Sequence, residues 1–355
     1  MNNYIVNDRH STLIPRYPSA INVNNTRYPE GTINPIEKKT ITKVINIDSL
    51  FRQNYTETTS TNFLWDLHKK ESNVVAMRVS SIDIPVAWYS ISEINNRNEF
   101  NITVHNWKCH CESTLYTITI PPGNYFSCDF INTLNGIFKT IGGGLLYLVA
   151  EIDTNTAKTI IRLDPSNYIG HLDCSHLYFE IDFFPNRDIF TACSPHTRKN
   201  TKQFQEFQRR VGWYMGFRNY DYIVNKSNNV AQTAFNTSTL LYCGAIASES
   251  TYSNSQANYC FLAIDDHHNN CVSQSIVSST GESYISNNIL ARITVNTLPN
   301  TVLYDNGCDK IFKERIYMGP ITLDKLKISL LNKYGEVIDL NGVDISFTLE
   351  LTELY

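Results

Sequence analysis

Two short clusters of cysteine and histidine carry the side chains best suited to binding a metal ion. They are Cys109-His110-Cys111 and the group His171, Cys174 and His176. Four of these side chains, Cys109, Cys111, Cys174 and His176, would give the thiolate and imidazole ligands of a tetrahedral zinc site. Neither cluster has C-x-x-C spacing, however, and adjacent residues of a strand point to opposite faces. We therefore favour buried thiols and loop histidines over a metal, and expect no cofactor.

A second stretch with potential chemistry is Asp265-Asp266-His267-His268, directly after an expected strand. Carboxylates and imidazoles side by side could hold a cation or act as general acid and base. Neighbouring carboxylates in a turn more often accept hydrogen bonds from backbone N–H groups. We predict a structural role for this stretch.

A run of basic residues could contact nucleic-acid phosphates or lipid headgroups. It consists of Arg198, Lys199, Lys202, Arg209 and Arg210. The whole chain has a net charge of −4, which gives no bulk attraction to polyanions. We expect this run to be a solvated face or a contact with an acidic neighbour in an assembly. Sequence-specific nucleic-acid binding is not expected.

No known catalytic motif occurs in the sequence. The nucleophile-elbow and zinc-protease patterns are both absent. The triple glycine at 142–144 precedes an expected strand, so it supplies no helix N-terminus for a phosphate group. We therefore expect a protein that is not an enzyme.

Composition indicates a globular chain with few charges, since 42% of residues are hydrophobic and 18% are charged. The first residues lack the apolar segment of an export signal. The longest apolar run, Leu145–Ala150, is too short to span a bilayer. The nine cysteines are scattered and odd in number, so we expect free thiols rather than a disulfide framework.

The stretch from Asn62 to Ile91 has the clearest strand pattern in the chain. Phe63, Trp65 and Leu67 alternate with polar or smaller residues, a polar link follows, and a longer β-branched piece begins at Val74. We expect two strands separated by that link. Pro85 lacks an N–H and should end the second strand. The Trp88 and Tyr89 rings then come in position to close one end of a β-sandwich core.

The rest of the chain shows further segments with a strand pattern and no alternation of strands with helices of the βαβ kind. We expect further strands over 100–104, 116–120, 145–152, 158–163, 177–183, 259–264, 289–295, 323–331 and 345–352. A helix fits 126–139, with Ser127 as its N-cap, and a second fits Phe204 to Tyr214. This pattern predicts an all-β fold, a jelly-roll β-sandwich with two short helices.

We place the domain boundaries where the hydrophobic periodicity of the expected strands begins and ends. Residues 1–43 contain four prolines and no periodicity, which predicts an extended N-terminal arm. Residues 44–355 are expected to form the jelly-roll domain. Within it, the basic and polar region 185–258 is predicted to be a long insertion between strands.

Several blocks of this sequence resemble virion proteins of nucleocytoplasmic large (giant) DNA viruses. They are INIDSLFRQNY (45–55), VVAMRVSSIDIPVAWYSIS (74–92), IPPGNY (120–125), VGWYMGFRN (211–219), FLAIDDHHNN (261–270) and the closing block 315–355. The resemblance implies a minor capsid protein of an icosahedral virus, with a jelly-roll fold and no enzymatic activity. It leaves open a penton subunit at the vertex or a protein that links major-capsid capsomers.

The same resemblance implies the surroundings of the protein. Its partners would be the major capsid protein and other minor capsid proteins, with copies of itself forming a pentamer if it lies at a vertex. It would be located in the virion, assembled in the host cytoplasm, with a position near an internal membrane left open.

Two other classes of function compete with this interpretation. Jelly rolls also bind sugars in aromatic-lined grooves, and the chain contains 21 tyrosines, so a glycan-binding module for host attachment is an alternative. A metal-dependent enzyme built on the Cys/His clusters is a third.

Overall fold

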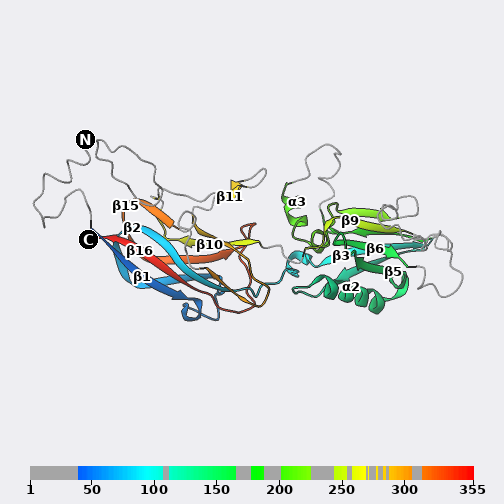
Figure 1. Ribbon diagram of the computed structural model, residues 1–355, viewed down its shortest axis with the longest axis horizontal. Coiled ribbons are helices and arrows are strands. Elements are labelled where there is room, and N and C mark those ends of the chain that lie inside the picture. The colour runs from blue at the N-terminus through cyan, green and yellow to red at the C-terminus, as the bar shows by residue number, and fades with distance from the viewer. Residues whose placement is uncertain are drawn as a thin grey trace, which may run out of the picture.

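Two lobes, each with its own hydrophobic core, lie end to end in the computed structural model (Figure 1). The structure describes residues 39–106, 112–164, 177–187, 201–224, 244–253, 258–268, 271, 277–278, 283–284, 288–305 and 314–355. The first lobe combines residues 39–86 with 258–355, and the second lobe is formed by residues 91–253. The second lobe is therefore inserted between two strands of the first.

The first lobe is built around one seven-stranded antiparallel sheet in the order β1-β16-β2-β15-β10-β13, with β14 also paired to β2. The strands are β1 (Thr40–Asp48), β2 (Asn62–Pro85), β10 (Tyr259–Asp265), β13 (Ile289–Thr294), β14 (Val302–Asp305), β15 (Glu314–Leu331) and β16 (Ser346–Leu354). A short 3-10 helix, η1 (Ser49–Phe51), follows β1, and β11 (Val277–Ser278) pairs with β12 (Ser283–Tyr284).

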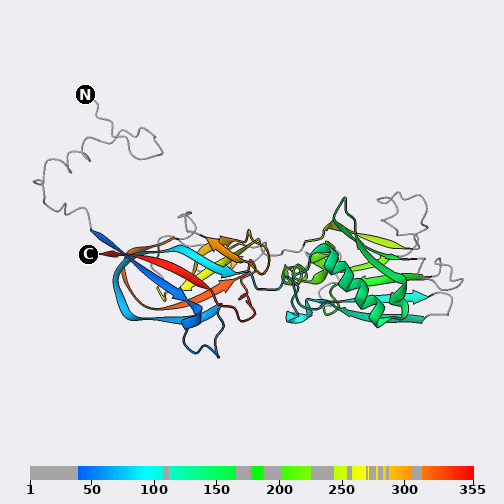
Figure 2. The same ribbon diagram turned by 60° about the horizontal axis from the view of Figure 1, so that its bottom comes forward.

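Strand β2 runs without a break through the expected polar link, so the prediction of two separate strands there was wrong. The pairing of β2 with β15 shifts register between Ile316 and Lys325, and such irregularities bend a strand. Both strands consequently curve round the core (Figure 2). Their inward side chains, such as Met77 and Ile328, meet Leu349 of β16 in one aliphatic core. Pro85 ends β2 as predicted.

The second lobe packs two smaller antiparallel sheets and one long helix. One sheet has the order β4-β3-β7-β8 and the other β5-β6-β9. The strands are β3 (Glu99–Asn106), β4 (Glu112–Thr119), β5 (Leu148–Ile152), β6 (Lys158–Leu163), β7 (Leu177–Asp182), β8 (Asp221–Val224) and β9 (Ala245–Thr251). The helices are α2 (Ser127–Ile141), α3 (Thr201–Phe207) and α4 (Val211–Tyr214), with short 3-10 turns η2 (Ile94–Asn96) and η4 (Gly143–Tyr147).

Helix α2 covers the core of the second lobe with the face that its sequence periodicity predicts. Phe130, Leu134 and Phe138 are buried. Ser127 is the first helical residue and not the N-cap, which is Phe126, and no side chain bonds the helix start. At the other end Gly142 has φ of 75°, a left-handed conformation that suits glycine, and its N–H donates to the Phe138 carbonyl.

The second predicted helix is two short helices, because the chain turns between them. Arg210 is extended, with φ of −90° and ψ of 158°, and serves as N-cap of α4. Its guanidinium donates to the carbonyls of Asn96 (3.0 Å) and Asn95 (3.2 Å). Those contacts require a break in the helix at this residue.

The all-β prediction is confirmed: antiparallel sheets dominate the described residues. The expected domain was 44–355, with 185–258 as an insertion between its strands. Side chains from within 185–258, among them Phe207, Phe217 and Val224, pack in the same core as β3 and α2. The expected arm lies outside the described residues up to Lys38, and β1 begins at Thr40. We propose that 44–355 comprises two units, with 91–253 as the inserted one. Across the described ranges, none of the helices is long and apolar enough to span a membrane.

Candidate functional site at the junction of the lobes

The residues weighed as metal ligands cannot be placed. Cys109, Cys111, Cys174 and His176, with the neighbouring His110 and His171, all lie outside the described residues. Within the described part of the chain, no three His, Cys, Asp or Glu side chains gather in a way that could hold a metal ion.

The acidic stretch after β10 is engaged in holding the first lobe together. The Asp266 carboxylate is buried and accepts hydrogen bonds from Arg315 Nη1 (2.7 Å) and from the Tyr317 hydroxyl. Asp265 and Asp266 also accept from the backbone N–H groups of His267 (2.9 Å) and His268 (3.0 Å). Burial and the nearby Asp266 charge raise the pKa of Tyr317 well above its ordinary value. This geometry has the features of a structural ion pair.

The basic run is only partly described, since Arg198 and Lys199 lie outside the described residues. Its last two members point into the molecule. Arg210 is 3% exposed and its guanidinium lies 4.1 Å from the centre of the Phe184 ring. Burial lowers the pKa of Arg210. Arg209 reaches across to the first lobe, where it forms part of an ion network.

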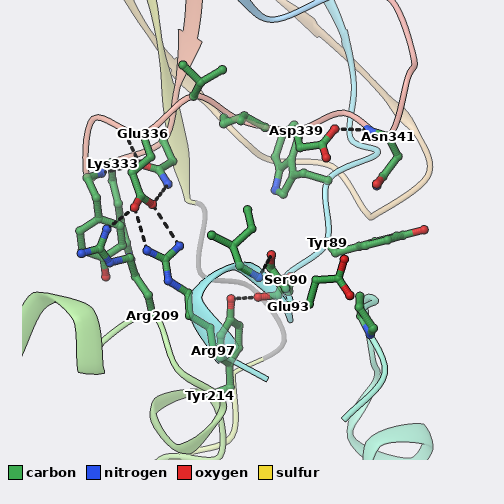
Figure 3. A pocket seen from close by; sticks show the side chains of 18 residues that line it. Tyr89, Ser90, Glu93, Arg97, Arg209, Tyr214, Lys333, Glu336, Asp339 and Asn341 are labelled. Carbon is green, nitrogen blue, oxygen red and sulfur yellow. Dashed lines mark hydrogen bonds and ion pairs between the residues drawn. The ribbon is translucent and has the colours of Figure 1, made fainter. Parts of the chain in front are cut away.

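This network is centred on Glu336, in the turn between β15 and β16 of the first lobe (Figure 3). Two arginines of the second lobe hold its carboxylate: Arg97 Nη2 lies 2.8 Å from Oε1, and Arg209 Nη1 is also paired with it. Arg97 forms a bidentate pair with Glu206 as well, at 2.9 and 3.0 Å. One carboxylate of the first lobe is thus clamped by the second lobe.

The electrostatics of the network favour the charged forms. Arg97 is 7% exposed, and burial opposes its charge. The hydrogen bonds that Arg97 donates to the carboxylates of Glu206 and Glu336 overcome that effect and raise the Arg97 pKa. For Glu336, burial acts to raise the pKa, but the bonds from Arg97 and Asn332 hold it below the ordinary value. Desolvated pairs of this kind are costly to break singly.

Local hydrogen bonds position Glu336 and Arg97. Asn332 Nδ2 donates to Glu336 Oε2 (3.0 Å), and Asn332 Oδ1 accepts the Glu336 N–H (3.0 Å). On the second lobe, the Arg97 carbonyl accepts the Val211 N–H at 2.8 Å. The Tyr214 hydroxyl donates to the Ser90 carbonyl. Side chains from three separate parts of the chain are therefore fixed at the junction.

A cavity of about 470 Å³ opens beside the network, between the two lobes (Figure 3). Four of the 18 residues that line it are aromatic, and charged side chains are spread around it. The lining includes Trp88, Tyr89, Glu93, Lys333, Tyr334 and Asp339. Rings beside charged groups at the mouth of a cavity could bind a ligand.

Sequence reasoning identified only part of this site. Trp88 and Tyr89 were expected to close one end of a core, and Trp88 does pack against the first core while Tyr89 is 46% exposed. Arg97 and Glu336 were missed. They are 239 residues apart, and no local pattern marks either one as half of an ion pair.

Matches to known proteins are found among solved structures. No family model matches the sequence, and no curated protein matches it. Among solved structures, the chain is similar to a mavirus penton protein, with 9% identity, a TM-score of 0.43, and coverage of 90% of this chain and 100% of that one. It is also similar to a chain of the Sputnik virophage, with 12% identity, a TM-score of 0.38, and coverage of 89% and 98%.

Proposed function

We propose that this chain is a structural protein of the virion, a minor capsid protein of an icosahedral large DNA virus. The proposal rests on the blocks of sequence that resemble such proteins and on how the first lobe presents apolar side chains to solvent. The first lobe would supply the jelly-roll part. We propose no enzymatic activity, because the acidic and basic groups noted from the sequence and described here serve one another or the backbone.

The observation that carries the proposal is two pairs of exposed apolar side chains on strands of the first lobe. They are Val302 and Tyr304 on β14, and Ile316 and Met318 on β15. These side chains are 58, 65, 46 and 74% exposed, respectively. Tyr304 pairs with Asp83 and Ile316 with Ala76 of β2, so β14 and β15 border the same edge of that strand. About seven residues of β2, or roughly 23 Å, separate the partner of Tyr304 from that of Ile316, so the two pairs are separate exposed positions on rigid strands that a partner could cover.

A second set of exposed apolar side chains also supports a role in assembly. Leu50 and Phe51 are 51 and 73% exposed on η1, in a loop that is held firmly from beneath. Arg52 Nη1 donates to Asp344 Oδ1 (2.6 Å) and to the Ser49 carbonyl (2.7 Å). A loop fixed in this way loses little conformational entropy when a partner covers its apolar side chains.

The finer proposal is a place at the vertex, as a pentamer, or between major-capsid capsomers, with the major capsid protein and other minor capsid proteins as partners. Quantitative mass spectrometry of purified virions, scaled to the major capsid protein, tests it. Closed icosahedral symmetry gives about 60 copies for a vertex subunit. A count several times larger would make the chain a linker. Absence from the particle would contradict the capsid proposal.

Glycan binding for host attachment is the second candidate function. It is favoured by the aromatic rings Trp88, Tyr89 and Tyr334 around the junction cavity, since flat rings stack on sugar faces. A glycan array probed with the full chain tests it. Binding no stronger than background would remove this candidate and leave the structural role unaffected.

A further inference from the structure

Three charged side chains that line the junction cavity form no ion pair with another described residue. Lys333 is half-buried, its Nζ lies 5.2 Å from the centre of the Tyr334 ring, and no ion pair is recorded for it in the described ranges. Burial lowers its pKa. Glu93 and Asp339 are exposed and likewise have no ion pair within the described part of the chain. Figure 3 shows Lys333 on one side of the cavity and the two carboxylates on the other.

Between these charges the cavity is lined by rings and aliphatic side chains. Trp88, Tyr89 and Tyr334 supply the rings, with Pro122 and Val337 beside them. Aromatic-lined grooves of this kind bind proline-containing segments, whose polyproline II conformation is preformed and therefore costs little entropy to bind. A fitting ligand would carry a positive charge at one end, a proline and a ring in the middle, and a negative charge at the other end.

The N-terminal arm contains a segment of this kind. The tripeptide Arg-Tyr-Pro occurs twice, at 16–18 and 27–29. Glu30 follows the second copy, whereas Ser19 follows the first. In polyproline II conformation the α-carbons of Arg27 and Glu30 are about 9 Å apart. Segment 27–30 therefore has a positive and a negative end separated by a tyrosine and a proline.

We propose that the junction cavity binds the Arg27–Glu30 segment from the arm of a neighbouring copy of this chain. Arg27 pairs with Glu93 and Asp339, Tyr28 and Pro29 lie against the rings, and Glu30 pairs with Lys333. This inference deepens the proposed function by naming a segment and its receptor site in the assembly.

The reach of the arm favours a neighbouring copy as its source. The start of β1 lies at the end of the first lobe that is remote from the second lobe (Figures 1 and 2). Strand β1 is about 26 Å long. Its last residue, Asp48, pairs with Ser346 of β16, and Ser346 pairs in turn with Asp83 of β2. Trp88 lies five residues beyond Asp83 in the sequence.

The cavity is therefore about 35 to 40 Å from Thr40. The ten residues from Glu30 to Thr40 span at most about 33 to 36 Å when fully extended. A copy could therefore reach its own cavity only with this stretch almost fully extended, whereas the arm of a neighbouring copy is not held to that distance.

Site-specific photocrosslinking in the full-length protein tests the inference. A photoreactive phenylalanine analogue replaces Tyr28, and ¹⁴N-labelled and ¹⁵N-labelled protein are mixed before irradiation. We expect cross-links that join a light chain to a heavy chain and fall in peptides containing residues 88–94 or 332–341. The same analogue at Tyr17 is the matched control, and we expect at least a fivefold lower yield because Ser19 offers no partner for Lys333. Cross-links confined to single chains, or to other surfaces, or absent altogether would overturn the inference.

Charge reversal provides a second test, in which a compensating double variant controls for loss of folding in the single variant. Lys333→Glu should lower the cross-link yield at Tyr28 by about tenfold, and adding Glu30→Lys in the same chain should restore it, since opposite charges meet again. An unchanged yield in the single variant, or no recovery in the double variant, would exclude the proposed register. Failure here is distinguishable from failure of the capsid proposal, because the copy number in virions is measured separately.

Discussion

The two lobes reach stability in different ways. The first lobe brings together segments from both ends of the sequence, and its sheet places β16 between β1 and β2. The second lobe is made from one continuous stretch, 91–253. A lobe built from a continuous stretch closes shorter loops on folding, so its contacts are more local. We infer that the second lobe is the more autonomous folding unit.

The cores differ in chemistry as well. The first core has two buried phenylalanines, Phe63 and Phe347, among aliphatic side chains, whereas eight occur in the second. In the second, the Phe183 ring lies 5.3 Å from that of Phe100 and 4.7 Å from that of Phe217. Aromatic pairs have preferred orientations, so this core depends on the geometry of a few large rings. The aliphatic core of the first lobe distributes its contacts over many strands.

The largest expected effect comes from removing one of these rings. Phe183→Ala should destabilise the second lobe by about 3 to 5 kcal/mol, because the side chain is fully buried and leaves a cavity. Leu349→Ala is the corresponding change in the first lobe, with an expected cost of about 2 to 5 kcal/mol. Differential scanning calorimetry should show that each variant shifts a different transition. A single transition lowered equally by both would contradict the division into two units.

A backbone change in the second lobe comes next. Gly216 has φ of 93°, and an added Cβ would lie 2.1 Å from the Ser250 carbonyl oxygen. Gly216→Ala should therefore cost at least about 2 kcal/mol, since the strand end at Ser250 must move. Gly136→Ala is the matched control. Nothing lies within 4 Å of its added Cβ, and in the middle of α2 alanine should stabilise by about 0.5 to 1 kcal/mol. Urea unfolding of both variants measures the difference.

A smaller loss of stability is expected from a change at the junction, where Glu336 links the two lobes. Glu336→Gln should cost about 1 to 2 kcal/mol, a value reduced from that of a fully buried pair because the Glu336 side chain is 35% exposed. Hydrogen exchange should increase at 93–98 and 332–338 and stay unchanged in both cores. Faster exchange throughout one core would mean that the ion network supports a whole lobe.

Lowering the pH should weaken the contact between the lobes in the unmodified protein, as Glu336→Gln does at neutral pH. The pKa of Glu336 in the folded state is lowered from its ordinary 4.5. The stabilisation from its ion pairs is therefore complete above pH 4.5 and is lost as the pH falls through the lowered value. Hydrogen exchange at 332–338 should rise in that window in the unmodified protein. In Glu336→Gln this pH dependence should be absent, and its persistence would point to another group.

The smallest effect is expected at the surface of the first lobe. Lys70 and Asp324 form an ion pair at 3.3 Å with side chains 68 and 50% exposed. Lys70→Ala should change the free energy of unfolding by less than about 0.5 kcal/mol, because water and salt screen such pairs. A larger change in urea unfolding would indicate that the bend of β2 depends on this contact.

The sequence predicted elements whose hydrophobic pattern is local. Strand β7, expected over 177–183, is found at Leu177–Asp182, and helix α2 matches its amphipathic pattern. It did not reveal that β2 continues through its polar link, because the register shifts there depend on the partner strand β15. The partition into two cores was also hidden, since the fragments of 185–258 resemble surface loops until they are packed against β3.

The candidate site was harder to predict than the fold. Arg209 and Arg210 were recognised as part of a basic run, but their inward direction depends on Glu336 and on the carbonyls of Asn95 and Asn96. Those partners are distant in sequence, and one of them is backbone. Charge alone indicates that a residue needs a partner, whereas only the fold determines whether that partner is solvent, an assembly neighbour or another part of the same chain.

The place of β16 in the sheet also sets an order of events during biosynthesis. All strands of the second lobe precede residue 252, whereas β16 begins at Ser346. At a translation rate of about 5 to 20 residues per second, roughly 5 to 20 s separate completion of the second lobe from synthesis of β16. During that interval the flanks of β1 and β2 that β16 will occupy are unpaired strand edges, which favour aggregation. A nascent chain thus carries a complete second lobe beside a first lobe in which β1 and β2 still lack the strand between them.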